Sequence, residues 1–142
     1  MSEVLLATFR CDAMVLALPV EVVLEVLGDQ SLEPVPRAPG AVIGLISLRG
    51  RILAVTDVRA RMGLPDGRQP DPAFYVVETG DELEVLRVDR AGEVLSVHPD
   101  QAIAVPDTTP AAIAAQLDGA FHVADQLVLV VDLKRILDAG ED

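Results

Sequence analysis

One sequence pattern occurs twice in this chain. Residues 52–62 read ILAVTDVRARM, and residues 127–137 read LVLVVDLKRIL. Each copy is an apolar run typical of a strand, followed by an aspartate and then by a basic stretch with helical character. The repeat predicts two related halves, each of which uses one strand–aspartate–helix unit.

The aspartates of the two copies are Asp57 and Asp132. A carboxylate directly before a helix can accept hydrogen bonds from the free backbone N–H groups of the first helical turn. We therefore expect Asp57 and Asp132 to cap their helices, which gives both residues a structural role.

Elsewhere the chain alternates short apolar runs with turn residues. At 142 residues it fits one domain or two small, closely packed subdomains. Residues 65–72, PDGRQPDP, are the strongest linker candidate, because turn-forming residues fill the whole stretch. Many short strands at close spacing, with few and brief helices, indicate β-barrels or a sandwich and not a parallel sheet. The sequence thus predicts a mainly β fold.

The net charge of −12 limits the classes of partner. A field of this sign repels phosphate backbones and anionic membrane surfaces, so we expect no nucleic-acid partner. Glu3 follows the start with no basic segment of a signal peptide, and no apolar run approaches the ~20 residues that span a bilayer. We expect a cytoplasmic protein without direct membrane insertion.

The sequence contains few residues that suggest catalysis. It has no metal-ligand spacing, phosphate-binding glycine loop or nucleophile elbow, so we expect no enzyme, metal or cofactor. Cys11 is the single cysteine and reads as a small strand or turn residue. His98 and His122 are isolated in sequence. A β-barrel enzyme or ligand-binding protein stays an alternative, which a polar pocket holding either histidine with a carboxylate would support.

Residues 44–59, GLISLRGRILAVTDVR, form two apolar strands joined by a polar turn. Arg49 stands in this turn between the strands, so we expect it to be partly buried and to need a partner. Glu25 is an isolated carboxylate in the apolar run at residues 24–27. An ion pair between Glu25 and Arg49 would satisfy both. The pair could simply fix the first subdomain, or it could shape a protein-binding groove.

At these residues the chain resembles the CheW-like chemotaxis coupling proteins, from about residue 5 to residue 137. Four ordered pieces carry the resemblance: VLALP at 15–19 leading into VLEV at 23–26; PRAP at 36–39 leading into GLISLRG at 44–50; ILAVTDVR at 52–59; and VDL at 131–133. Their order and spacing together are specific. The chain departs from the family pattern at Ser47, Ala54, Val85 and Arg87, the last of which interrupts a strand that is normally aliphatic.

The resemblance implies two small five-stranded, SH3-like β-barrels packed side by side, with short helices, in a single domain over residues 1–142. On this basis the first barrel covers approximately residues 14–70 and the second approximately residues 71–130. The terminal segments, residues 1–13 and 131–142, would pack back across the pair.

The resemblance also implies a function without catalysis. Members of the family bridge the cytoplasmic tips of chemoreceptors to the regulatory domain of a histidine kinase. Glu25 and Arg49 match the family's Glu and Arg near the receptor-facing groove, with Val23 beside them, and edge strands of either barrel would meet the kinase. We therefore expect a cytoplasmic adaptor that is recruited to receptor arrays. The alternative is a CheW-like scaffold in a non-chemotaxis or surface-motility signalling system.

Overall fold

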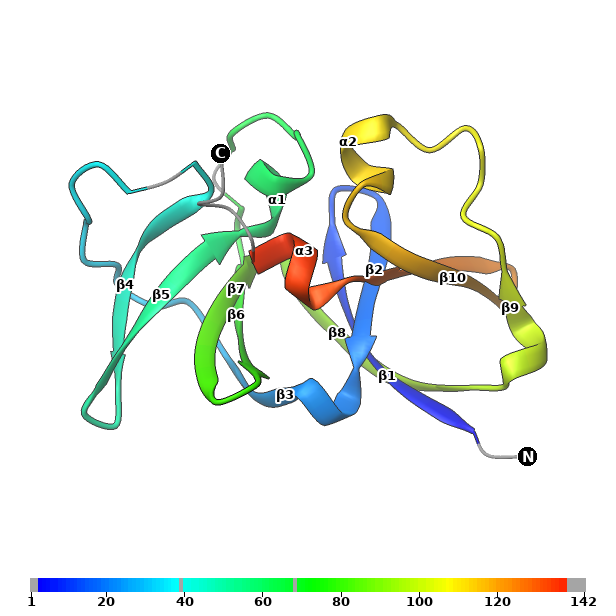
Figure 1. The fold of residues 1–142 in the computed structure, drawn as a ribbon, viewed down its shortest axis with the longest axis horizontal. Coiled ribbons are helices and arrows are strands. Elements are labelled where there is room, and N and C mark those ends of the chain that lie inside the picture. The colour runs from blue at the N-terminus through cyan, green and yellow to red at the C-terminus, as the bar shows by residue number, and fades with distance from the viewer. Residues whose placement is uncertain (1–2, 39, 68, 138–142) are drawn as a thin grey trace.

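The protein is mainly β (Figure 1). The structure is a computed structural model that describes residues 3–38, 40–67 and 69–137. The strands within these ranges are β1 (Val4–Cys11), β2 (Met14–Pro19), β3 (Val23–Leu27), β4 (Val42–Leu48), β5 (Arg51–Asp57), β6 (Ala73–Thr79), β7 (Glu82–Val88), β8 (Arg90–Val97), β9 (Ala102–Ile103), β10 (Leu117–Val123) and β11 (Gln126–Val131). The helices are short: α1 (Val58–Arg61), α2 (Ala111–Ala114), α3 (Leu133–Leu137) and the 3-10 turns η1 (Val20–Val22) and η2 (Pro99–Gln101).

The strands form two sheets with the same internal plan. One sheet has the order β8-β1-β2-β11-β10-β9, and the other has the order β3-β6-β7-β5-β4. In each sheet the strand of the sequence repeat, β11 or β5, pairs in parallel with the second strand of a hairpin, β2 or β7. The remaining strand pairs are antiparallel. The repeat read from the sequence is therefore a repeat of the fold.

The division of strands between the sheets differs from the predicted boundary near residue 70. The β1–β2 hairpin belongs to the same sheet as β10 and β11, and the β6–β7 hairpin belongs to the same sheet as β4 and β5. Each half of the sequence thus gives its first hairpin to the sheet of the other half. Residues 14–19 lie in the six-stranded sheet, and residues 73–88 lie in the five-stranded sheet. Residues 1–2 and 138–142 of the predicted terminal segments lie outside the described residues.

Two short links explain this exchange. After β2, Pro19 has a φ of −55° and leads into the single turn of η1, which redirects the chain into the other sheet. After β7, Asp89 alone separates the strand from β8. A β-hairpin needs a loop of at least two residues, so β8 does not fold back beside β7 and enters the six-stranded sheet instead.

Three apolar clusters hold the two sheets. The largest lies between them and includes Phe9 and Leu16 from one sheet and Tyr75 and Leu86 from the other. Each sheet has a further cluster on its other face, around Val128 in the six-stranded sheet and around Phe74, Val76 and their neighbours in the five-stranded sheet. Successive residues of β6 therefore face different clusters, as the alternation of a strand requires.

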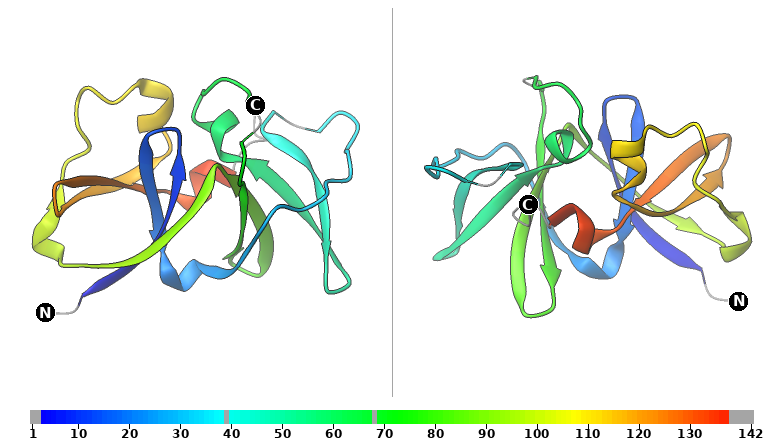
Figure 2. Two further views of the ribbon diagram at one scale, coloured as in Figure 1. Left: turned by 180° about the vertical axis from the view of Figure 1, so that it is seen from behind. Right: turned by 45° about the horizontal axis from the view of Figure 1, so that its top comes forward.

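The two subdomains lie side by side, with α3 between them in both further views (Figure 2). Arg61 of α1 reaches α3, where its Nε donates to the Ile136 carbonyl at 3.0 Å and its Nη2 donates to the Arg135 carbonyl at 2.6 Å. The helices of the two repeat units are thus joined directly. A mainly β fold of two SH3-like subdomains is confirmed, although the described residues form open sheets and not closed rings of paired strands.

Candidate protein-binding site

The turn between β4 and β5 presents Arg49 at the end of the five-stranded sheet. Leu48 pairs with Arg51, which leaves Arg49 and Gly50 as a two-residue loop. Both loop residues have a positive φ, 51° for Arg49 and 82° for Gly50. This combination is typical of a type I′ turn, which matches the twist of the flanking strands. Glycine adopts this conformation easily, but an arginine does so at a cost in backbone strain.

Arg49 and Glu25 form an ion pair, with 2.7 Å between Arg49 Nη2 and Glu25 Oε2. Glu25 lies on β3, which is one edge of the sheet, while the turn joins β5 to the opposite edge strand, β4. The pair therefore links the two sides of a strongly curved sheet. The Arg49 side chain is 70% exposed and the Glu25 side chain 29%. The expectation that Arg49 is partly buried was wrong, because a hairpin tip projects into solvent.

Apolar side chains near this ion pair in sequence differ in their exposure. Val23, on the same strand as Glu25, is half-buried and packs against the cluster between the sheets. The larger exposed apolar surface comes from Leu24 and Val26, which are 51% and 46% exposed, and from Ile52, which is 71% exposed. These three are not among the residues predicted from the sequence, although alternation along β3 places Leu24 and Val26 on the face opposite Glu25. Exposed apolar groups of this size suit a protein-binding surface.

The predicted helix caps differ from one another in geometry. Asp132 Oδ1 accepts a hydrogen bond from the Arg135 N–H at 3.1 Å, the contact expected of an N-cap carboxylate. Asp57 occupies the N-cap position of α1, but its carboxylate makes no capping hydrogen bond of standard geometry. It faces Arg87, with 3.4 Å between Arg87 Nε and Asp57 Oδ1. The capping role of Asp57 stays a prediction, because a backbone hydrogen bond from Ala60, in the first turn of α1, lowers the pKa of its carboxyl.

The contact between Asp57 and Arg87 follows from strand register. The two residues are direct neighbours in the parallel pair of β5 and β7, so opposite charges face each other across the strands. Arg87 is the basic residue that interrupts an aliphatic strand of the family pattern, and Asp57 is its partner. Burial raises the pKa of the Asp57 carboxyl, and the nearby Arg87 charge opposes this shift without cancelling it.

The raised pKa of Asp57 predicts a dependence of stability on pH. The folded protein holds a proton on Asp57 at pH values where the unfolded chain, with a pKa near 3.8, has lost it. The Asp57 contribution to the free energy of unfolding therefore increases as pH falls through this window. In urea unfolding between pH 7 and pH 4, the wild type should gain stability relative to Asp57→Asn. Arg87→Gln should enlarge that gain, and parallel curves for wild type and Asp57→Asn would contradict the prediction.

A second group of charges lies buried where the two subdomains meet. Arg59 of α1 is 8% exposed and Asp89 is 9% exposed. Arg59 Nη1 lies 2.8 Å from Asp89 Oδ2 and 2.6 Å from Asp12 Oδ1. The rest of the guanidinium donates to the Pro65 carbonyl at 2.9 and 3.1 Å. Asp89 Oδ2 also accepts the backbone N–H of Asp12 at 2.7 Å. The group fixes the link at which the chain crosses between sheets.

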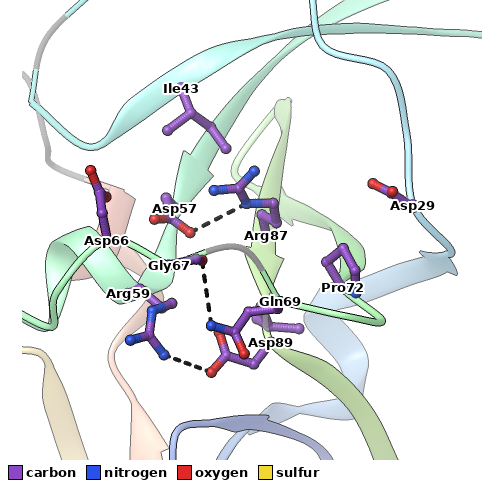
Figure 3. A pocket seen from close by; sticks show the side chains of 11 residues that line it. Asp29, Ile43, Asp57, Arg59, Asp66, Gly67, Gln69, Pro72, Arg87 and Asp89 are labelled. Atoms are coloured by element: carbon purple, nitrogen blue, oxygen red, sulfur yellow. Dashed lines mark hydrogen bonds and ion pairs between the residues drawn. The ribbon is translucent and has the colours of Figure 1, made fainter.

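A cavity of about 490 Å³ opens beside these charges (Figure 3). Its charged lining residues are Asp29, Asp57, Asp66, Asp89, Arg59 and Arg87. Four carboxylates face two guanidinium groups, and both guanidinium groups already bind carboxylates of the lining. The cavity therefore contains the Arg59–Asp89 contact beside the crossing between the sheets and the Asp57–Arg87 contact within the five-stranded sheet, and none of its described lining residues is a histidine.

Neither histidine lines the 490 Å³ cavity, and the cysteine is buried. His98 Nε2 lies 3.5 Å from Glu3 Oε2 on the surface, and His122 is exposed on β10. Cys11 is fully buried, and burial raises the pKa of its thiol to about 12. Among the residues that the structure describes, no group of three or more metal-ligating side chains could hold a metal ion.

Comparison with known proteins identifies the family. The CheW-like domain model matches residues 5–141. The chain belongs to the CheW-like domain family. It is 24% identical over 140 residues to the chemotaxis protein CheW of Rhizobium meliloti, with 96% of this chain and 88% of that protein covered. It is 26% identical over 133 residues to the chemotaxis protein CheW of Thermotoga maritima, covering 92% and 85% of the two chains. The family resemblance read from the sequence is confirmed.

A solved structure shows the same fold. The scaffolding protein TtCheW from Thermoanaerobacter tengcongensis superposes with a TM-score of 0.83 at 23% identity, over 92% of this chain and 90% of that chain. Within the described ranges, no helix of this protein has the length and apolar character needed to cross a membrane.

Proposed function

We propose that the protein is a non-catalytic adaptor that couples the signalling tips of chemoreceptors to a histidine kinase. The match of a CheW-like domain to nearly the whole chain carries this proposal. The relatives are chemotaxis proteins, and the chain covers most of the length of two of them. The adaptor acts in the cytoplasm as one domain and reaches the membrane through receptor arrays.

The receptor-binding surface of this proposal is centred on Glu25 and Arg49, with Val23 beside them. Three properties support it. The ion pair is accessible, because most of the Arg49 side chain is exposed. The arginine is held at a positive φ, a strained conformation of the kind that persists at functional positions. Ile52 of β5, three residues after Arg49, is 71% exposed and supplies apolar contact area near the turn. The kinase regulatory domain would bind at exposed strand edges elsewhere on the subdomains.

Charge reversal at Arg49 tests this surface. Arg49→Glu places two carboxylates in contact and should weaken co-sedimentation with chemoreceptor membranes about tenfold, a loss of ~1.4 kcal/mol of binding free energy. The fold should survive, because an exposed ion pair contributes only about 0.2–1 kcal/mol to stability. Arg51→Glu is the matched control: it reverses a charge two residues away, on an exposed side chain that makes no ion pair with a described residue.

The double variant Glu25→Arg with Arg49→Glu separates two roles of the pair. Recovery of receptor binding would mean that the pair shapes the surface, whereas continued loss would mean that the partner contacts Arg49 itself. A folded Arg49→Glu protein with unchanged binding to receptor membranes would contradict the proposed site. Absence of binding by the wild type to both chemoreceptors and the histidine kinase would contradict the proposed function.

A further inference from the structure

Arg10 and Arg90 face each other directly across the antiparallel pair of β1 and β8. Like charges in this arrangement destabilise a sheet. The chain carries 23 acidic side chains, so carboxylate partners are abundant. Neither guanidinium group nevertheless makes a hydrogen bond or ion pair with another residue that the structure describes, whereas Arg49, Arg59 and Arg87 do. Two unpaired cations are thus held together in a strongly acidic protein.

A cavity of about 340 Å³ lies against this pair, on the exposed side of β8. Its charged lining residues are Arg10, Arg90 and Glu93, and Gln126 adds a side-chain amide. Positive charge therefore exceeds negative charge inside it. In the 490 Å³ cavity, carboxylates outnumber guanidinium groups. A third cavity, of about 260 Å³, is lined by the same two arginines and by three aspartates, so negative charge exceeds positive charge there as well. The 340 Å³ cavity is a local positive site on a molecule of net charge −12.

The backbone around this cavity is fixed before any ligand arrives. Pairing between β1 and β8 shifts register between Ala7 and Phe9, which forms a bulge. The Tyr75 hydroxyl donates to the Thr8 carbonyl at 2.7 Å and accepts the Gly92 N–H at 3.1 Å, so it pins both strands at the bulge. A methyl group at Gly92 would lie 2.8 Å from the Thr8 carbonyl oxygen, so the two strands approach too closely for a side chain there. This rigid frame holds the two arginines opposite each other.

We propose that Arg10 and Arg90 form a binding site for a phosphate group. Two guanidinium groups match the double negative charge of a phosphate monoester, and their planar N–H groups suit its acceptor oxygens. The Gln126 amide in the lining supplies a further donor. The phosphate neutralises the repulsion between the arginines, so binding stabilises the β1–β8 pair. A free phosphate compound and a phosphorylated side chain of a partner offer this same chemistry.

Titration of the full chain with inorganic phosphate tests the site. Amide resonances of Arg10, Arg90 and Gln126 should shift saturably with phosphate and remain unchanged with chloride at equal ionic strength. Arg10→Gln and Arg90→Gln should weaken phosphate binding at least tenfold. Arg51→Gln removes the same charge from an exposed position outside the cavity and should bind phosphate as the wild type does.

Thermal unfolding gives a second readout. Phosphate should raise the midpoint temperature of the wild type and of Arg51→Gln by mass action, but not that of Arg90→Gln. Without phosphate, Arg90→Gln should unfold at or above the wild-type temperature, because one repelling charge is gone. A non-saturable response to phosphate, or an equal response in Arg90→Gln and Arg51→Gln, would overturn the proposal.

With binding established, tighter binding of O-phosphoserine than of inorganic phosphate would identify a phosphorylated side chain as the natural ligand. The reverse order would identify a free phosphate compound.

Discussion

Arg59→Met is expected to lower the free energy of unfolding by roughly 3–5 kcal/mol, the cost of removing one partner from a buried ion pair. Asp89 is 9% exposed, and the guanidinium group of Arg59 is its only cationic partner among the described residues. Without it, a mostly buried carboxylate remains with no opposite charge. The Pro65 carbonyl loses two donors at the same time. Urea unfolding at pH 7 measures this effect.

A second variant shows whether the loss comes from the uncompensated charge. Arg59→Met combined with Asp89→Leu removes both buried charges and should recover a large part of the stability, since apolar replacement of a whole buried pair is often neutral or favourable. The same comparison is a double-mutant cycle, so it yields the coupling free energy of the pair. Arg51→Met is the control for loss of an exposed arginine and should change stability by less than about 0.5 kcal/mol. A similarly small loss in Arg59→Met would show that water solvates Asp89 in this variant.

The contacts of Arg59 with Asp12 and Asp89 could not be predicted from the sequence. Turn chemistry, apolar periodicity and the position of Asp132 before a basic stretch are local properties, so they predicted short strands, the turn at Arg49 and a helix start near residue 133. The contacts of Arg59 join residues 47 and 30 positions apart, to Asp12 and Asp89. They exist because the chain crosses between sheets twice. No local pattern specifies such a crossing, since each half alone could pair its own hairpin with its own repeat strand.

The position of Arg87 in the sequence indicated that it needs an acidic partner, but not which residue the partner is. A charge inside an apolar strand requires a partner when the strand is buried. The partner, Asp57, was assigned to the backbone of α1 because it precedes that helix in sequence. Only the parallel register of β5 with β7 brings the two residues opposite each other. The Glu25–Arg49 contact was inferred because each is an isolated charge among apolar residues, and its role in protein binding stays a prediction.

Tyr75 provides the second connection between the sheets, and it differs from Arg59 in being uncharged. It lies on β6 of the five-stranded sheet and is 1% exposed. Its hydroxyl bonds the backbone of Thr8 and Gly92 in the six-stranded sheet. Its ring packs on Phe9, with 5.1 Å between the ring centroids and 59° between the planes. One side chain thus joins the central apolar cluster to the bulge of the β1–β8 pair.

Tyr75→Phe is expected to lower the free energy of unfolding by roughly 1–3 kcal/mol. The ring and its packing on Phe9 are retained, but the Thr8 carbonyl and the Gly92 N–H lose their hydroxyl partner in a part-buried site, and unsatisfied polar groups cost about this much. Phe9→Leu separates the two contributions, because it disturbs the ring contact and leaves both hydrogen bonds in place. A change below about 0.5 kcal/mol in Tyr75→Phe would show that water satisfies the two backbone groups.

Unfolding at alkaline pH measures the contribution of the Tyr75 hydroxyl separately from that of the ring, because Tyr75 is the one tyrosine of the sequence. Burial raises the pKa of the Tyr75 hydroxyl, and the hydrogen bond from Gly92 offsets part of the shift. Above pH 10.0 the unfolded chain loses this proton while the folded protein keeps it. Stability therefore falls as pH rises through this window. Burial of Cys11 also lowers the free energy of unfolding as pH rises above 9.0, but the wild type and Tyr75→Phe share this effect. The wild type should accordingly lose stability more steeply than Tyr75→Phe above pH 10, and equal slopes would mean that the hydroxyl is solvated in the folded protein.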